Sequence, residues 1–188
     1  MIRIAVFASG SGTNAENIIN YFNKHHSVKV VYVLTNNKNA GVIKRADRLG
    51  ITLKIFSKKE LFSDEFIQFL KKEADFIVLA GFLLKIPSRI ITLFPNKIIN
   101  IHPALLPKYG GKGMYGSHVH KAVVENKEKE SGITIHYVND NYDEGAIIFQ
   151  ESVPLTEMDT DDDVAAKIHV LEQKNFPKVI EKVILANK

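Results

Sequence analysis

Short apolar runs alternate with amphipathic stretches through the first half of the chain, and this alternation limits the fold more than any other feature. The runs are rich in β-branched residues and too short for helices, which predicts buried strands. We expect strands at residues 2–8, 28–35, 53–56, 75–80 and 98–101. Because strands alternating with helices build parallel sheets with right-handed crossovers, we predict an α/β fold with a doubly wound, mostly parallel twisted sheet and a Rossmann-like N-terminal half.

The stretches between the runs carry the apolar spacing of helices. We expect helices after residue 14 and at residues 40–49, 58–73, 87–94, 118–125 and 164–185, with two further strands at 132–138 and 146–153. No linker, repeat or low-complexity tract interrupts the pattern. A chain of 188 residues is therefore expected to form one domain.

The composition excludes several classes of protein. The absence of cysteine excludes disulfides, thiolate catalysis and cysteine-ligated zinc. The formal net charge of +4 suits small anionic substrates, but the basic residues are scattered among 21 acidic ones, so no nucleic-acid partner is expected. No apolar run approaches the roughly 20 residues of a membrane span, and the N-terminus does not look like a signal peptide. We expect a soluble cytoplasmic protein with no membrane partner.

A glycine-rich turn, S-G-S-G-T-N, covers residues 9–14 between the first strand and the first helix. This arrangement aims backbone N–H groups and a helix N-terminus at an anion. Thr13 and Asn14 can cap the helix or reach a ligand. The turn is not a P-loop, and Ala15 stands where a dinucleotide-binding motif needs its third glycine. Phosphate binding and a purely structural tight turn are both open at this point.

The strand at residues 98–101 leads into a pair of polar side chains. Strand alternation puts Asn100 and His102 on the same face, and Pro103 should end the strand because it cannot donate a ladder hydrogen bond. Ligands of open α/β sheets bind beyond the carboxyl ends of the strands. An amide and an imidazole are therefore expected where a substrate would lie. The alternative is a strand end with a hydrogen-bonded core histidine.

Other segments carry weaker signals. Residues 103–117 are too rich in glycine and proline for regular structure, and such long loops are usually functional or disordered. Residues 139–145 form a polar turn with three carboxylates, which an ordinary strand connection also explains. We interpret His136 as a structural histidine. His118 and His120 point apart on a helix, so they do not indicate a metal site.

Four motifs, spread over nearly the whole chain, point to one family. They are I-A-V-F-A-S-G-S-G-T-N near the start, L-A-G-F-L-L at 79–84, I-N-I-H-P-A-L-L-P-K at 99–108, and S-G-I-T-I-H-Y-V with D-E-G following. Together they resemble the phosphoribosylglycinamide formyltransferase family, folate-dependent enzymes of purine biosynthesis, from residue 2 to about residue 180. The Asn-x-His-Pro-x-Leu-Leu-Pro string with a downstream aspartate is specific for folate-linked formyl transfer and hydrolysis.

The resemblance implies that the formyl group of 10-formyltetrahydrofolate, a co-substrate, passes to the amine of phosphoribosylglycinamide in de novo purine (IMP) biosynthesis, with no metal. It implies one formyltransferase domain over 1–188, with a nucleotide- and phosphate-binding half at 1–100 and a catalytic and folate-binding half at 101–188. A monomer or homodimer is expected.

The resemblance also implies roles for individual residues. The implied catalytic residues are Asn100, His102 and Asp143. The implied ligands of phosphoribosylglycinamide are Gly12, Thr13, Asn14 and Glu172. The implied folate-binding residues are Lys59, Leu83, Leu84, Lys85, Ile86, Asn100, Asn139, Asp140, Asn141, Tyr142 and Asp143.

The chemistry that these residues allow is direct transfer through a tetrahedral intermediate. Asp143, if it reaches His102, should raise the pKa of the imidazole and keep it charged. The amide of Asn100 and a protonated His102 would then donate to the developing oxyanion. Two departures affect these expectations. Lys59 stands where many relatives carry arginine, so bidentate carboxylate binding would be lost. The loop at 109–116 is longer and richer in glycine than usual.

Other functions are less favoured. Methionyl-tRNA formyltransferase should carry a basic C-terminal domain, and formyltetrahydrofolate hydrolase an N-terminal regulatory domain, and we expect neither in this chain. A non-catalytic regulator that binds folate or nucleotide would not need all three of Asn100, His102 and Asp143. A general dinucleotide-binding protein is the weakest alternative, because the third glycine is missing.

Overall fold

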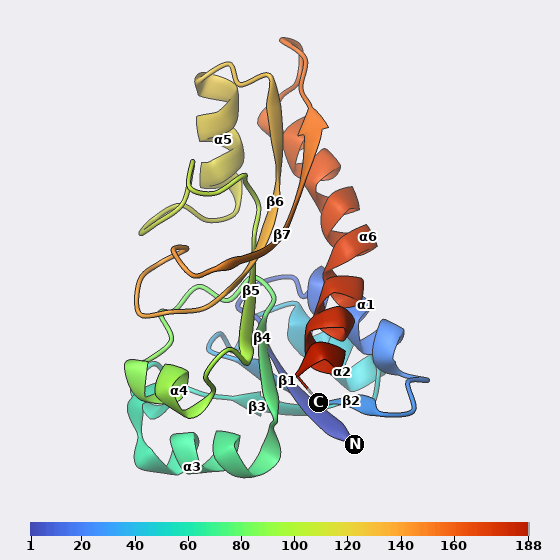
Figure 1. Cartoon of the computed structure of the whole chain (residues 1–188), viewed down its shortest axis with the longest axis vertical. Coiled ribbons are helices and arrows are strands. Elements are labelled where there is room, and N and C mark those ends of the chain that lie inside the picture. The colour runs from blue at the N-terminus through green and yellow to red at the C-terminus, as the bar shows by residue number, and fades with distance from the viewer. Residues whose placement is uncertain (188) are drawn as a thin grey trace. The chain divides into compact units, whose positions relative to one another are not determined.

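The computed structural model describes residues 1–187, and its described strands form one seven-stranded sheet in the order β3-β2-β1-β4-β5-β6-β7 (Figure 1). The strands are β1 Ile2–Phe7, β2 Val28–Thr35, β3 Thr52–Ile55, β4 Phe76–Leu79, β5 Ile98–His102, β6 Glu130–Tyr137 and β7 Ile147–Pro154. β1 is parallel to β2 and to β4, β2 is parallel to β3, and β6 and β7 are antiparallel. The predicted doubly wound, mostly parallel α/β fold is confirmed.

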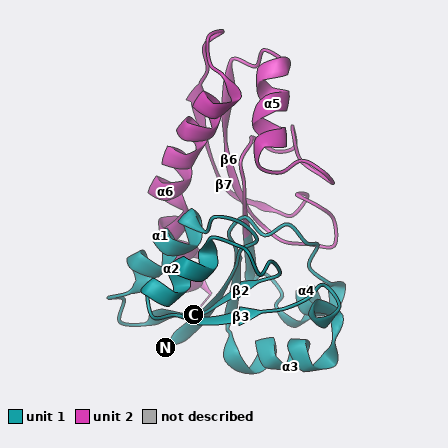
Figure 2. Ribbon diagram, turned by 180° about the vertical axis from the view of Figure 1, so that it is seen from behind, with its two compact units in different colours: residues 1–99 teal, residues 100–188 magenta. Residues whose placement is uncertain are grey.

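The helices follow the predicted order along the chain. They are α1 Thr13–Phe22, α2 Val42–Arg48, the 3-10 helix η1 Glu60–Phe62, α3 Asp64–Glu73, α4 Ser88–Leu93, α5 Ser117–Glu125 and α6 Asp161–Ala186. The chain divides into two compact units, residues 1–99 and residues 100–188 (Figure 2). The division falls inside β5, so that Asn100 and His102 belong to the second unit.

The first unit holds β1 to β4 with helices on both sides. α1 packs against β2 and α2, and α3 packs against β1 and α4 (Figure 2). An aromatic cluster fills the space under α3, where the Phe7 ring meets the rings of Phe56, Phe66 and Phe82 in edge-to-face contacts at 5.2–6.4 Å. Since Phe82 is buried in this cluster, the next residue, Leu83, turns outward and is 48% exposed.

The helix expected at residues 58–73 is in fact two helices. Ser57 and Glu60 close the turn that leads into the short η1, because the side chain of each accepts a hydrogen bond from the other's backbone N–H. Ser63 is extended at φ −78° and ψ 152°, and its hydroxyl accepts the N–H of Phe66, which starts α3 afresh. The apolar spacing continues through Ser63 and so hid this break, although serine is a poor interior residue of a helix and a good N-cap.

The second unit is built on β6, β7 and the long α6. α6 packs against both strands and against α5 (Figure 1). It begins at Asp161, three residues before the predicted start, because Thr160 and Asp163 form a capping box. Within residues 1–187, no helix is long and apolar enough to cross a membrane.

Candidate active site

Asn100 and His102 lie at the carboxyl end of β5, two residues apart and on one face as expected. The strand ends at His102, immediately before Pro103. His102 is 3% exposed, whereas Asn100 is half-buried. An amide and a nearly inaccessible imidazole therefore stand side by side at the end of a buried strand.

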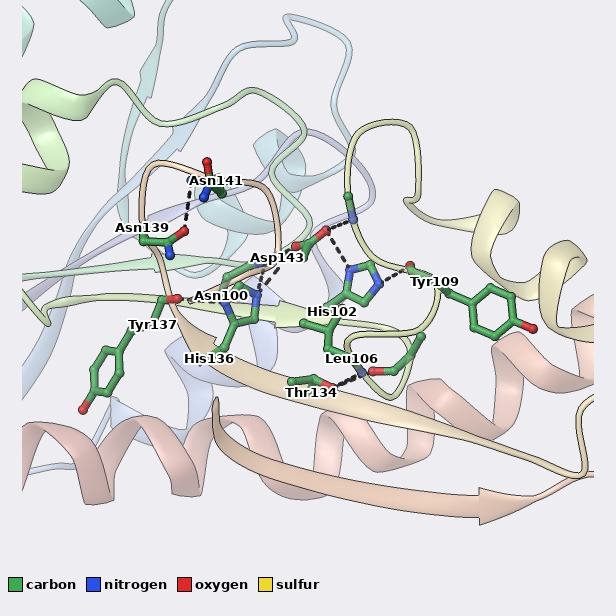
Figure 3. Close-up of polar contacts among 12 residues, drawn as sticks. Asn100, His102, Leu106, Tyr109, Thr134, His136, Tyr137, Asn139, Asn141 and Asp143 are labelled. Atoms are coloured by element: carbon green, nitrogen blue, oxygen red, sulfur yellow. Dashed lines mark hydrogen bonds and ion pairs between the residues drawn. The ribbon is translucent and has the colours of Figure 1, made fainter. Parts of the chain in front are cut away.

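Asp143 reaches these two residues from the turn between β6 and β7 (Figure 3). Its Oδ2 lies 3.6 Å from Nδ1 of His102, and its Oδ1 lies 3.5 Å from Nδ2 of Asn100. Two local features make this turn tight. Asp143 has a left-handed φ of 56°, and a Cβ on Gly145 would lie 1.7 Å from the Tyr137 carbonyl oxygen. The turn is therefore shaped to present this carboxylate.

His136 completes the cluster. Its Nδ1 lies 2.8 Å from the backbone carbonyl oxygen of Tyr137, so Nδ1 carries the proton and Nε2 keeps a lone pair. That lone pair accepts the Asn100 amide at 3.1 Å, and Nε2 lies 3.6 Å from Oδ1 of Asp143. The interpretation of His136 as a hydrogen-bonded structural histidine missed that its partner is Asn100. Its place on the same strand face as Thr134 was the available signal.

His102 carries its proton on Nε2. Nε2 lies 2.7 Å from the carbonyl oxygen of Tyr109, which can only accept, so Nδ1 presents its lone pair toward Asp143. Burial lowers the pKa of His102 more strongly than the negative charge of Asp143 raises it, and the net shift is downward. The prediction that Asp143 keeps this imidazole charged is therefore wrong: desolvation of the ring outweighs a carboxylate at 3.6 Å.

Asp143 itself stays ionised. Burial raises its pKa, but the neighbouring side chains of His136 and His102 and the backbone N–H of Gly111 together lower it further, so the net shift is downward. The Gly111 N–H donates to Oδ2 at 3.0 Å. The glycine-rich loop at 109–116 thus contacts both His102 and Asp143 through its backbone.

The segment after β5 is fixed by a buried hydrogen-bond network. Thr134, fully buried on β6, donates to the Ala104 carbonyl at 2.7 Å and accepts the Leu106 N–H at 3.0 Å. Gln150 donates to the Leu106 carbonyl at 3.0 Å and to the Thr134 hydroxyl at 2.8 Å. Three of these hydrogen bonds therefore hold the chain just beyond His102 to β6 and β7, and the fourth joins Gln150 of β7 to Thr134 of β6.

The glycine-rich turn in the first unit places a glycine at the start of its helix. The N-cap of α1 is Gly12, at φ 80° and without a side-chain cap, rather than Thr13 or Asn14. The carbonyl oxygens of the turn face α2 and the segment before it: those of Ser9, Gly10 and Ser11 accept from the Asn37 side chain, the Val42 N–H and the Arg45 guanidinium, respectively. Gly12 has no side chain with which to cap the helix, and the N-terminus of a helix suits an anion.

The remaining residues of the implied binding sites lie in both units. Leu83 is exposed and its N–H donates to the Ser9 hydroxyl at 3.0 Å, Leu84 is half-buried, Lys85 is exposed and Ile86 is buried. Lys59 is exposed at the start of η1. In the second unit, Asn139, Asp140, Asn141 and Tyr142 are exposed in the turn that carries Asp143. Glu172 lies on α6, with Oε2 3.6 Å from Nδ1 of His169.

No group of three or more histidine or acidic side chains that could hold a metal ion is found among residues 1–187. The functional groups of the candidate site are an amide, two imidazoles and a carboxylate. Such a set can donate hydrogen bonds and move a proton.

Comparisons with known proteins agree with this picture. Residues 2–180 match the family model described as formyl transferase. The chain is 40% identical over 193 residues to the chloroplastic phosphoribosylglycinamide formyltransferase of Arabidopsis thaliana, covering 95% of this chain and 64% of that protein. It is 35% identical to the trifunctional purine biosynthetic protein adenosine-3 of Chironomus tentans, covering 96% of this chain and 14% of the relative. The chain thus spans less than two thirds of both relatives.

A solved structure is similar over nearly the full length of both chains. The phosphoribosylglycinamide formyltransferase of Bacillus halodurans superimposes with a TM-score of 0.87 at 33% sequence identity. The alignment covers 99% of this chain and 97% of that one.

Proposed function

Because the chain belongs to the formyl transferase family, we propose that it transfers the formyl group of 10-formyltetrahydrofolate to the amine of phosphoribosylglycinamide, in purine biosynthesis. The names of two relatives support phosphoribosylglycinamide as the formyl acceptor, and the name of a third supports a place in purine biosynthesis. The single observation that carries the proposal is the meeting of Asn100, His102 and Asp143 at the end of β5. Neither folate binding nor nucleotide binding alone needs a buried imidazole with its lone pair held toward a carboxylate.

The amine of the nucleotide attacks the formyl carbon, which forms a C–N bond and turns the formyl oxygen into an oxyanion. The attacking nitrogen then carries one proton too many. Nδ1 of neutral His102 accepts it, and Asp143 stabilises the imidazolium. The tetrahedral intermediate collapses as the bond to the folate nitrogen breaks, and the same proton goes to that leaving nitrogen. The enzyme ends in its starting state, with no covalent intermediate.

Asn100 is the donor to the oxyanion. One of its amide N–H groups is held by His136 at 3.1 Å, but the other lies 3.5 Å from Asp143, at the outer limit of a hydrogen bond. The second N–H can therefore turn to the developing oxyanion at little cost. One such donor is worth roughly 3 to 4 kcal/mol in the transition state.

Binding of the substrates is assigned to the residues that the resemblance implies. The ribose phosphate lies on Gly12, Thr13 and Asn14, at the N-terminus of α1. Glu172 binds the glycinamide nucleotide. The folate lies on residues 83–86 and 139–143 and on Lys59. We further propose that the protein acts in the cytoplasm, as a monomer or homodimer and without a metal.

The experiment mixes the protein with both substrates and follows the folate product by absorbance. We expect product only when phosphoribosylglycinamide is present. Product in its absence would identify a hydrolase, and binding of both compounds without any turnover would identify a regulator. Replacing His102 by alanine should abolish the transfer while leaving nucleotide binding measurable by calorimetry.

A further inference from the structure

Tyr109 connects the buried site to an acidic side chain near the surface. Its carbonyl oxygen lies 2.7 Å from Nε2 of His102, and its hydroxyl donates to Oε1 of Glu128 at 2.9 Å. Glu128 lies in the connection between α5 and β6. One residue therefore contacts the imidazole through its backbone and the carboxylate through its ring.

The backbone of Tyr109 is held in an unfavourable conformation. Its φ is 56°, a left-handed value that residues other than glycine seldom adopt. Such a conformation persists only where the surroundings fix it. The carbonyl oxygen reaches His102 in this conformation, so whatever fixes Tyr109 also fixes the partner of Nε2.

Glu128 is well suited to fix it. Hydrogen bonds from Lys108 and Tyr109 lower the pKa of Glu128, so it stays ionised and is a strong acceptor for the tyrosine hydroxyl. The Glu128 side chain is 24% exposed, whereas Lys108 is 69% exposed. The bond to the tyrosine is thus the more protected of the two contacts that Glu128 makes with the loop.

We propose that Tyr109 and Glu128 are positioning residues for His102. The hydrogen bond from the Tyr109 hydroxyl to Glu128, here called the tether, holds the Tyr109 carbonyl against Nε2 of His102. This contact keeps the ring proton on Nε2 and leaves the lone pair of Nδ1 facing Asp143. Without the tether the ring proton can reside on Nδ1, where it bonds to the ionised Asp143, and the lone pair that accepts the substrate proton is lost. The inference rests on the proposed role of His102 in proton transfer.

The test uses three variants. Tyr109→Phe removes only the hydroxyl, Glu128→Ala removes its acceptor, and Lys108→Met is the matched control that breaks the other contact of Glu128. The tautomer of His102 is read from the ¹⁵N shifts of its ring, assigned by comparison with His102→Asn. We expect a pure Nε2–H tautomer in the wild type and in Lys108→Met, and a mixture in the other two.

The kinetic expectation is a three- to tenfold loss of kcat in Tyr109→Phe and in Glu128→Ala, with KM for both substrates unchanged. The double variant should be no worse than either single one, because both changes break the same bond. Additive losses, or a pure Nε2–H tautomer in Tyr109→Phe, would overturn the proposal. A lower melting temperature with an unchanged tautomer and kcat would show that the tether is only a structural contact, and this result would also overturn the proposal.

The tautomer is measured without substrate. It therefore reports on the tether even if the wild-type protein does not transfer formyl groups, in which case the proposed function fails and the positioning of His102 is still decided.

Discussion

The chemistry of the site depends on which atom of His102 is free to take a proton. The Tyr109 carbonyl occupies Nε2, and burial keeps the ring neutral in spite of Asp143. A neutral ring with its lone pair beside a carboxylate can act as a base, and in the proposed reaction it accepts a proton after the amine has attacked. The carboxylate's contribution is therefore greatest when the imidazolium forms.

The neutral ring fixes the sign of the pH dependence. Since the pKa of His102 is lowered from its ordinary value of 6.5, the base is already deprotonated at pH 7. Activity is lost only as the pH falls through the lowered pKa. We expect kcat to be flat near neutral pH with an acid limb whose midpoint lies below 6.5. A kcat that rises as the pH falls through this range would show that the charged imidazole is the active form.

Replacing Asp143 by asparagine tests whether its negative charge, rather than the size of its side chain, matters for catalysis. In Asp143→Asn the side chain keeps its size, but the imidazolium loses its counter-charge, and we expect kcat to fall about 10²- to 10⁴-fold. Glu144→Gln, one residue along the same turn, is the control and should keep wild-type kcat. Equal, small effects of the two changes in a steady-state assay would remove Asp143 from the mechanism.

At the scale of elements, the glycine-rich turn is shaped by the start of α2. A Cβ on Gly12 would lie 2.5 Å from the Val42 side chain, and its φ is 80°. Gly10, two residues earlier, has open space around it and no such φ. Of the two glycines in this turn, only Gly12 is therefore required on steric grounds.

This difference gives a paired prediction. Gly12→Ala should lose about 1 to 3 kcal/mol of stability, because the backbone there is strained for any other residue, and should weaken nucleotide binding by shifting the turn. Gly10→Ala should do neither. Urea unfolding and calorimetric titration with phosphoribosylglycinamide measure both effects. A stable Gly12→Ala protein with unaltered nucleotide affinity would argue against phosphate binding at this turn.

The sequence was a good guide where one physical rule dominated. Because buried strands are apolar, the bounds of β2 and β5 could be predicted to within a residue or two. Strand alternation correctly placed Asn100 and His102 on one face. The break at Ser63 was missed because the apolar spacing runs through it. The neutral state of His102 was missed because it depends on how deeply the ring is buried, and its contact with Tyr109 depends on a left-handed backbone that no local pattern indicates.

At the scale of the whole molecule, one ion pair joins the starts of two neighbouring strands. Asp75, just before β4, accepts the backbone N–H of Arg3 at 2.8 Å and its guanidinium at 3.0 and 3.1 Å. The hydrogen bond from the Arg3 side chain is the largest cause of the lowered pKa of Asp75. The side chains are 37% and 40% exposed, so solvent screening reduces what the pair contributes.

We therefore expect Asp75→Asn to lose about 1 kcal/mol at pH 7. Because the folded pKa lies below the unfolded one, this stability is present above about pH 4 and is lost as the pH falls through the folded value. Thermal unfolding at pH 7 and in a series descending below about pH 4 should show the gap between the wild type and the variant closing only in the acid range. Asp64→Asn, which breaks the more exposed pair with Arg89, is the control with little effect. A gap between Asp75→Asn and the wild type that widens in acid would contradict the assignment.

The central claim is that one active site passes a formyl group directly between two bound molecules. It is tested most directly by initial rates of folate product formation, measured over a matrix of concentrations of phosphoribosylglycinamide and 10-formyltetrahydrofolate. Direct transfer predicts intersecting lines in the double-reciprocal plot and no burst of product when the nucleotide is withheld. Parallel lines, together with a formylated protein in the absence of nucleotide, would contradict it.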